Sequence, residues 1–371
     1  MKQSRHWTMA VAVLAIAGAV FAQDANKSWT DKLTIKGDVR YRYQSSDEEG
    51  KDHQPREQHR LRARLNIGAT VADDLKVGIR LVTNNGNPIS DNITLTDSFD
   101  DKEFRIDQAF FDWQPTEGLN VLAGKMAQPW ISVSDLVFST DMNPEGVAIK
   151  GSLELAEGAT GLMSVGYWQL QERSEDADTT MGSDQIALRL APREGVHVVV
   201  GTGIFAFKEI KGRKLLHNET KSFGNTTRKV GSGDTQYLVY ANDYSVVEGF
   251  VETGFPIAGI PVVLSGQYAI NTDADADDKA YLGQIKIGQA SAPKTWELGY
   301  QYRRLEKDSV LGVFAENTDT GNGTDVSAHI PYVAYAVHKN FTIKLQYAMA
   351  QKGLDNGKDL DTFKADFLVK F

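Results

Sequence analysis

The chain ends with TFKADFLVKF, residues 362–371, in which two kinds of side chain alternate strictly. Counted back from the end, every second residue is apolar: Phe371, Val369, Phe367, Ala365 and Phe363. The residues between them are mostly charged. Strict alternation over such a length is typical of a β-strand with two unlike faces. The pattern alone does not say which face points to the inside of the molecule.

The same alternation recurs along most of the chain, and helical periodicity is almost absent. In LTIKGDVRYRY, residues 33–43, an apolar and aromatic face opposes Lys36, Arg40 and Arg42. We expect about sixteen strands of this kind, with a bulge near 104–114 and near 146–153, where alternation is poor. The predicted strands are 33–43, 59–71, 75–84, 104–114, 119–127, 146–153, 161–172, 183–191, 195–207, 246–255, 261–271, 279–288, 295–305, 327–338, 341–350 and 362–371.

The spacers between these strands alternate in length. A long polar spacer follows the first strand, and only Ala72-Asp73-Asp74 follows the second. Long spacers rich in Asp, Asn, Gly, Ser and Thr then alternate with short turns such as PTEG and PREG. This rhythm predicts an up-and-down meander with two different ends.

Two orientations of such a sheet remain open from the pattern itself. If the apolar faces pointed inward, the chain would be a secreted soluble β-protein, and the alternative function is then carbohydrate binding. Outward apolar faces would make a transmembrane barrel around a polar lumen. Strands of about ten residues, an even strand number, two unlike ends and aromatic residues at strand ends favour the barrel. A closed barrel also pairs every backbone group in lipid.

The N-terminus predicts export. Lys2, Arg5 and His6 precede a short apolar run, and small residues follow it up to Ala22. This is the pattern of a secretory signal peptide, too short for a membrane anchor. We expect residues 1–22 to be the signal peptide and residues 23–371 to be the β-barrel of a bacterial outer membrane.

Composition excludes several functions. The chain has no cysteine, so disulfides and thiolate sites are absent. The net charge is −9, or −11 without Lys2 and Arg5, which makes nucleic acid a poor partner. The seven histidines lack metal-ligand spacing, and nucleotide-binding fingerprints are absent. We therefore predict no cofactor, no catalytic residues and no enzyme activity; an outer-membrane barrel enzyme is the alternative.

Basic residues gather on the polar faces of the first strands, and carboxylates lie in the third long spacer, 128–145. Neighbouring antiparallel strands bring such side chains close together. We expect this spacer to fold inward and set carboxylates opposite the arginines, because charged rings filter solutes by sign and size. The predicted lining residues are Arg40, Arg42, Arg60, Arg62, Arg64, Arg80, Lys125, Asp135, Asp141 and Glu145.

The acidic loop TDADADD, residues 272–278, spaces Asp273, Asp275 and Asp277 as a calcium loop does. It lacks glycine at the sixth position and glutamate at the twelfth, where Gln284 stands. A solvated acidic loop is therefore the favoured interpretation, with calcium as the alternative.

The sequence resembles bacterial outer-membrane porins, in particular the family labelled "putative porin". The most specific stretch is GKMAQPWISVSDLVFSTDMNPEGVAIKG, residues 124–151, supported by residues 105–115, 243–262 and 313–325. The resemblance implies a sixteen-stranded barrel with a water-filled lumen, a third loop that narrows it, and a homotrimer. It also implies recognition of Phe371 by the barrel-assembly machinery and contact with outer-membrane lipid and lipopolysaccharide. The expected function is passive diffusion of small hydrophilic solutes or ions, and the sequence does not rank anions against cations.

Overall fold

A computed structural model describes residues 29–51, 54–96 and 98–371. The predicted signal peptide, residues 1–22, lies outside this range. One sheet contains seventeen strands; the two-residue β4 (Ile93–Thr94) pairs only with Arg60 and Leu61, so sixteen strands form the wall. They are β1 (Leu33–Glu48), β2 (Arg56–Ala72), β3 (Leu75–Thr83), β5 (Phe104–Thr116), β6 (Leu119–Lys125), β7 (Glu145–Ala156), β8 (Ala159–Gln171), β9 (Thr179–Arg193), β10 (Val196–Lys208), β13 (Ser245–Ile257), β14 (Ile260–Asn271), β15 (Lys279–Gly288), β16 (Trp296–Leu305), β17 (Val326–His338), β18 (Phe341–Lys352) and β19 (Lys358–Lys370).

The remaining elements are small. A hairpin of β11 (Thr227–Val230) and β12 (Tyr237–Tyr240) lies in the loop after β10, and the 3₁₀ helices are η1 (Trp29–Lys32) and η2 (Gly233–Thr235). In the described part of the chain, no helix has the length and apolar character to cross a membrane.

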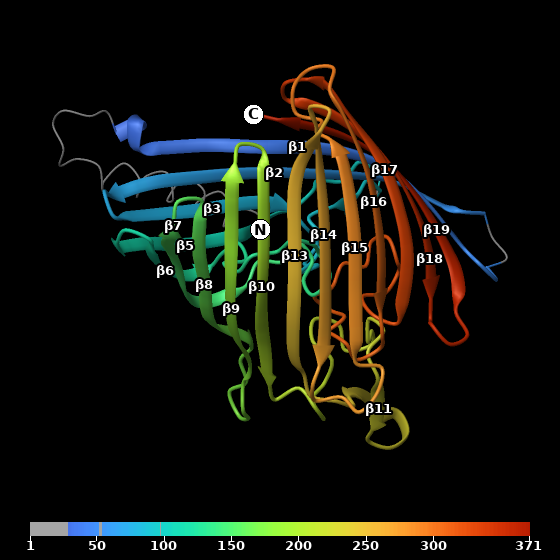
Figure 1. Cartoon of the computed structure of the whole chain (residues 1–371). Helices are drawn as coiled ribbons and strands as arrows, with labels where there is room; N and C mark the ends of the chain where they lie inside the picture. Colours follow the sequence, from blue (N-terminus) through green and yellow to red (C-terminus); the bar gives the residue numbers. More distant parts are fainter. Residues whose placement is uncertain (1–28, 52–53, 97) are drawn as a thin grey trace, which may run out of the picture.

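The wall closes into a barrel because the last strand pairs with the first. β19 runs antiparallel to β1 (Figure 1). In their register, Tyr41 lies opposite Phe367. Beyond the end of β19, Phe371 and Gly37 exchange two backbone hydrogen bonds of 3.0 Å. A Cβ atom on residue 37 would lie 2.5 Å from the backbone oxygen of Arg64 and 2.5 Å from the Phe371 ring, so glycine is required there. The terminal strand, extended to Lys358, thus leaves no open edge.

The connections confirm the predicted alternation. Two-residue turns join β2 to β3 and β9 to β10, whereas long loops follow at the other end, including residues 84–103, 126–144, 209–244 and 306–325. Neighbouring wall strands are antiparallel throughout, which makes the barrel an up-and-down meander.

Apolar side chains face outward and ionic ones face inward, as expected for a transmembrane barrel. On β1 and β19, Ile35 and Val369 are 62% and 45% exposed. Arg42 and Lys364, on the other face of the same strands, are 8% and 3% exposed. An outward apolar surface of this extent is stable only where lipid or another protein, and not water, covers it.

A bulge interrupts β5, as the weak alternation of residues 104–114 predicted. Arg80 pairs with Gln108 and Leu81 pairs with Ile106, which leaves Asp107 as the extra residue. Asp107 and Gln108 are consequently both buried on the lumen side. In β7 the irregularity falls after Glu154, at the end of the strand rather than within 146–153.

Candidate functional site

Five guanidinium groups from β1 and β2 face the lumen side by side, and we call them the arginine cluster. Arg40 lies opposite Arg62 and Arg42 opposite Arg60 in the strand register, with Arg64 next to them. The two-residue period of each strand places all five on one face. Sequence alternation therefore located these residues correctly on a common face of the wall.

Two carboxylates from the wall itself hold the cluster together. Asp38 accepts hydrogen bonds from Arg62 at 2.7 Å and from Arg64 at 2.8 Å. Asp366 of β19 forms a two-point contact with Arg42, at 2.6 and 2.8 Å. Charge-assisted pairs of this kind fix the direction of the guanidinium planes.

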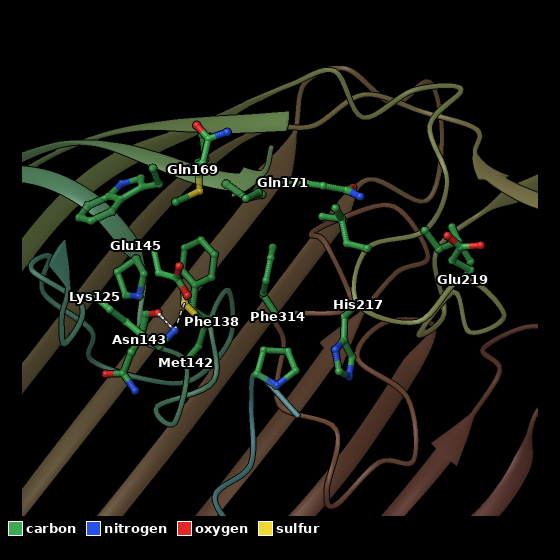
Figure 2. A pocket seen from close by; sticks show the side chains of 17 residues that line it. Lys125, Phe138, Met142, Asn143, Glu145, Gln169, Gln171, His217, Glu219 and Phe314 are labelled. Carbon is green, nitrogen blue, oxygen red and sulfur yellow. Dashed lines mark hydrogen bonds and ion pairs between the residues drawn. The ribbon is translucent and has the colours of Figure 1, made fainter. Parts of the chain in front are cut away.

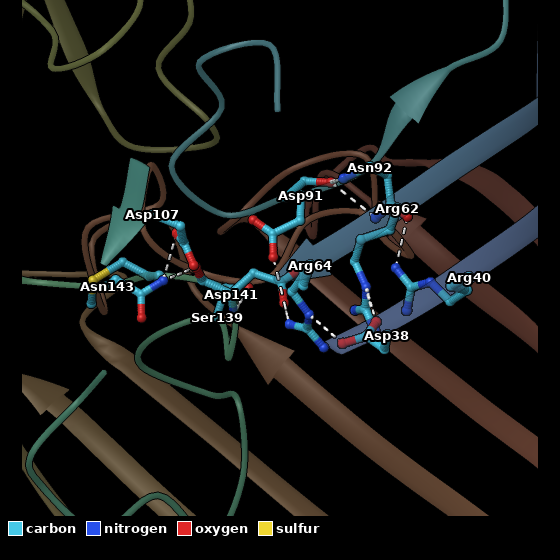
Figure 3. Close-up of polar contacts among 12 residues, drawn as sticks. Asp38, Arg40, Arg62, Arg64, Asp91, Asn92, Asp107, Ser139, Asp141 and Asn143 are labelled. Carbon is cyan, nitrogen blue, oxygen red and sulfur yellow. Dashed lines mark hydrogen bonds and ion pairs between the residues drawn. The ribbon is translucent and has the colours of Figure 1, made fainter. Parts of the chain in front are cut away.

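The loop after β3 brings further polar groups to the cluster. Asn92 accepts a 2.7 Å hydrogen bond from Arg40, and an Asp91 oxygen lies 3.5 Å from Arg64 (Figure 3). The two-residue β4 pairs with β2 and holds this loop against the wall, with Thr94 opposite Arg60. Sequence reasoning missed Asp91 and Asn92, because their spacer carries no periodicity.

Asp91 is only 1% exposed, and its environment is rich in negative charge. Burial, and after it the nearby carboxylates of Asp141 and Asp107, together raise the pKa of Asp91 to about 7 against the opposing effect of Arg64. This carboxyl group therefore changes charge close to neutral pH.

Segment 126–144, which follows β6, supplies Asp141 to the same region. Its carboxylate lies 3.6 Å from a guanidinium nitrogen of Arg64. Asn143 donates a 2.8 Å hydrogen bond to Asp107, which lies 3.3 Å from Arg80 (Figure 3). Arg64 and Arg80 thus both have partners connected to this segment.

Charge pairing within the cluster is incomplete in the described structure. Five guanidinium groups lie among four carboxylates that approach them within 4 Å, from Asp38, Asp91, Asp141 and Asp366. The buried Nε atoms of Arg40 and Arg60 have no hydrogen-bond partner among the described residues. The guanidinium groups of the cluster therefore outnumber the carboxylates that contact them.

Segment 126–144 is anchored on the other side of the barrel by four aromatic rings, which we call the aromatic anchor. Trp130 and Phe138 come from the segment, and Trp168 and Phe205 come from β8 and β10. Ring centroids lie 4.8 to 5.7 Å apart, with edge-to-face contacts prominent. All four side chains are at least 94% buried. Packed rings of this size dominate local stability.

Three predicted lining residues lie away from the arginine cluster. Asp135 forms an ion pair with Arg303 of β16 and a 3.3 Å hydrogen bond with Gln301. Lys125 and Glu145 form a 2.7 Å ion pair at the paired ends of β6 and β7. This pair lines a second cavity, beside the end of segment 126–144.

A second loop, residues 306–325, also places charge against the wall. Asp319 lies 2.6 Å from the Lys364 ammonium group and accepts a 2.9 Å hydrogen bond from Gln346. Burial opposes ionisation of Asp319, but Lys364 and Arg42 outweigh it and lower the pKa. No periodicity or motif predicts this contact, because it depends on the path of the loop.

A polar cavity of about 330 Å³ separates segment 126–144 from strands β15 to β18. Lys286, Lys344 and Gln346 line the wall side, and Ser134 and Asp135 line the segment side. The Lys344 ammonium group lies 4.0 Å from the centre of the Tyr332 ring. This space has the polarity that a water-filled passage requires.

The calcium alternative gains no support from the acidic loop 272–278. The Asp277 carboxylate lies 3.8 Å from the Lys307 ammonium group, so a cation of the chain itself is adjacent. Over the described ranges, no group of three His, Cys, Asp or Glu side chains is arranged to hold a metal ion.

An antiparallel sixteen-stranded barrel with an apolar exterior and an ionic interior defines the class of outer-membrane channel-type barrels. The sequence profile of the family described as "Putative porin" matches residues 50–244 and 243–371. The chain belongs to that family. None of the curated proteins matches it.

Solved structures of bacterial outer-membrane proteins share the fold. OprB of Pseudomonas putida has 9% identity and a TM-score of 0.60, covering 92% of this chain and 95% of its own. OmpF of Salmonella typhi, solved with daunomycin, has 10% identity and a TM-score of 0.54, with coverages of 91% and 97%. A loop-deletion mutant of OmpT, an outer membrane protein of Vibrio cholerae, has 15% identity and a TM-score of 0.53, with coverages of 92% and 100%.

Proposed function

We propose that the chain forms a water-filled channel through which small hydrophilic solutes or ions diffuse passively across the outer membrane. The observation that carries the proposal is the division of side chains, with apolar rows outside and the arginine cluster inside. The family and the shared fold support an outer-membrane channel. The solute gradient then sets the direction of flux.

Filtering, in this proposal, arises where segment 126–144 narrows the lumen. The segment contacts the lumen-facing Gln185 of β9, Gln267 of β14 and Arg303 of β16, and these contacts support infolding. Asp91 and Asp141 oppose the arginine cluster, so a transverse field crosses the remaining passage. Charges in such confinement interact more strongly than in bulk water.

The biological setting is part of the same proposal. Export by residues 1–22, recognition of Phe371 during barrel assembly and contact with lipopolysaccharide would deliver and hold the barrel in the outer membrane. We also propose a homotrimer, because the trimer form of Vibrio cholerae OmpT has this fold, with 15% identity and a TM-score of 0.50.

Planar-bilayer recording of purified residues 23–371 tests the channel. We expect stepwise, ohmic conductance that scales with salt concentration. Heat-denatured protein at the same detergent concentration is the control. Folded barrel that inserts into the bilayer without conducting would overturn the proposal.

A further inference from the structure

A second cavity lies near the long-loop end of the barrel, apart from the arginine cluster (Figure 2). Its volume is about 460 Å³, within the ~300–1,000 Å³ range of small-molecule sites. Its lining comes from the end of segment 126–144, from strands β6 to β9, from loops 209–244 and 306–325, and from Pro88 in the loop after β3. Parts of the chain that are far apart in the sequence thus converge on one space.

The deep part of this cavity is apolar. Phe138, Met142, Trp168 and Met181 line it, and each is at most 7% exposed. The indole N–H of Trp168 donates to Ser183 at 2.9 Å, so its single polar atom is satisfied within the wall. Methionine side chains adapt their shape to apolar ligands of different outline.

One side of the cavity carries opposite charges close together. Lys125 and Glu145, which also line it, form their 2.7 Å ion pair there. Lys125 additionally donates to the backbone oxygen of Asn143 at 3.2 Å, which leaves one of its three ammonium hydrogens available. The Glu145 side chain is 62% exposed, so solutes from water can reach it.

A solute with both charges can engage this pair without leaving a lone charge beside the apolar lining. Its carboxylate would bond to Lys125 and its ammonium group to Glu145, while its side chain contacts Met142 and Met181. A solute with one charge satisfies only one partner, and a zwitterion without an apolar side chain leaves the deep part unfilled.

We propose that this cavity binds small zwitterions with an apolar side chain, the chemistry of apolar α-amino acids. The inference rests on the proposed channel function and deepens it by naming a solute class that lodges beside the passage.

L-phenylalanine serves as the probe in two measurements on the full mature chain. Single-channel recording gives the concentration that halves the ion current, and calorimetric titration of detergent-solubilised barrel gives binding without any need for conduction. Glycine and phenylacetate are the matched solutes. We expect L-phenylalanine to bind, and to halve the ion current, at concentrations about tenfold or more below those of glycine or phenylacetate. This difference is equivalent to ~1.4 kcal/mol of binding free energy.

Variants locate the site. Met142→Gln with Met181→Gln should raise the half-blocking concentration about tenfold, and Lys125→Gln with Glu145→Gln should remove the preference over phenylacetate. Leu95→Gln, on an exposed loop, is the control. It should change neither the half-blocking concentration nor the preference over phenylacetate. Unaltered open-channel conductance shows that each variant folds.

The outcomes separate the two proposals. Binding of L-phenylalanine no tighter than that of glycine, or unchanged binding in the methionine variant, overturns the site. Calorimetric binding by a folded barrel that does not conduct supports the site and overturns the channel.

Discussion

Two parts of the barrel wall differ in how they contact segment 126–144. Toward β1 and β2 the contact is ionic, through Asp141 and Arg64 at 3.6 Å. Toward β8 and β10 it is apolar, through the aromatic anchor with rings as close as 4.8 Å. Apolar packing fixes a position, whereas a partly solvated ion pair contributes little stability. In the proposed channel, anchoring and filtering therefore belong to different residues and can be changed separately.

Deleting residues 131–141 should have the largest effect, because it removes Phe138 of the anchor together with Asp135 and Asp141. With the segment no longer held across the barrel, single-channel conductance should rise at least about twofold. Planar-bilayer recording measures the change. Unchanged or lower conductance in a folded barrel would count against infolding.

Trp130→Ala with Phe138→Ala tests the apolar side alone. Each buried aromatic truncation costs about 3–5 kcal/mol, so the segment should detach while the wall remains intact. We expect higher, noisier conductance and new protease cleavage within the segment. Trp113→Ala, on the exposed outer face, is the control and should leave both unchanged.

Replacing Arg60, Arg62 and Arg64 by glutamine tests the ionic side alone. The lumen loses positive charge while Asp91 and Asp141 remain, so preference should shift toward cations. The reversal potential under a salt gradient reports the shift, with Arg105→Gln, an exposed residue paired with Glu103, as the control. A reversal potential equal to that of the parent protein would reject the cluster as the filter.

Asp91→Asn should produce the smallest effect, which is visible mainly as a change in how ion selectivity depends on pH. The raised pKa of about 7 means that Asp91 is uncharged below that pH and anionic above it. Cation preference should therefore increase as pH rises through about 7 in the parent protein, and stay flatter in the variant. Because Asp91 holds its proton more tightly in the folded protein, it contributes to the free energy of unfolding. This contribution is complete below the ordinary pKa of 3.8 and is lost as pH rises through 7.

The control for that experiment is Asp101→Asn, on an exposed part of the same loop. Identical pH profiles of selectivity in the parent and Asp91→Asn would show that this carboxyl group does not titrate in the conducting path.

Sequence periodicity predicted the wall well, because side-chain direction in a strand depends only on position along the chain. It placed the arginine cluster on one face and located the bulge region around Asp107. The contacts of Asp91 and Asp319 were not predictable, since they depend on the path of loops without periodicity. The place of Lys125 and Glu145 beside the second cavity likewise depends on the end of segment 126–144, and their role in lining the channel stays a prediction.

The orientation of the wall is the claim on which the whole account depends, and adjacent residues of β18 test it directly. Leu345 faces outward and is 42% exposed, whereas Gln346 lines the polar cavity. The chain has no cysteine, so Leu345→Cys and Gln346→Cys each introduce a single thiol. In proteoliposomes, a charged, membrane-impermeant thiol reagent should modify residue 346 rapidly and spare residue 345. Rapid modification of residue 345 with protection of residue 346 would contradict an apolar exterior around a watery lumen.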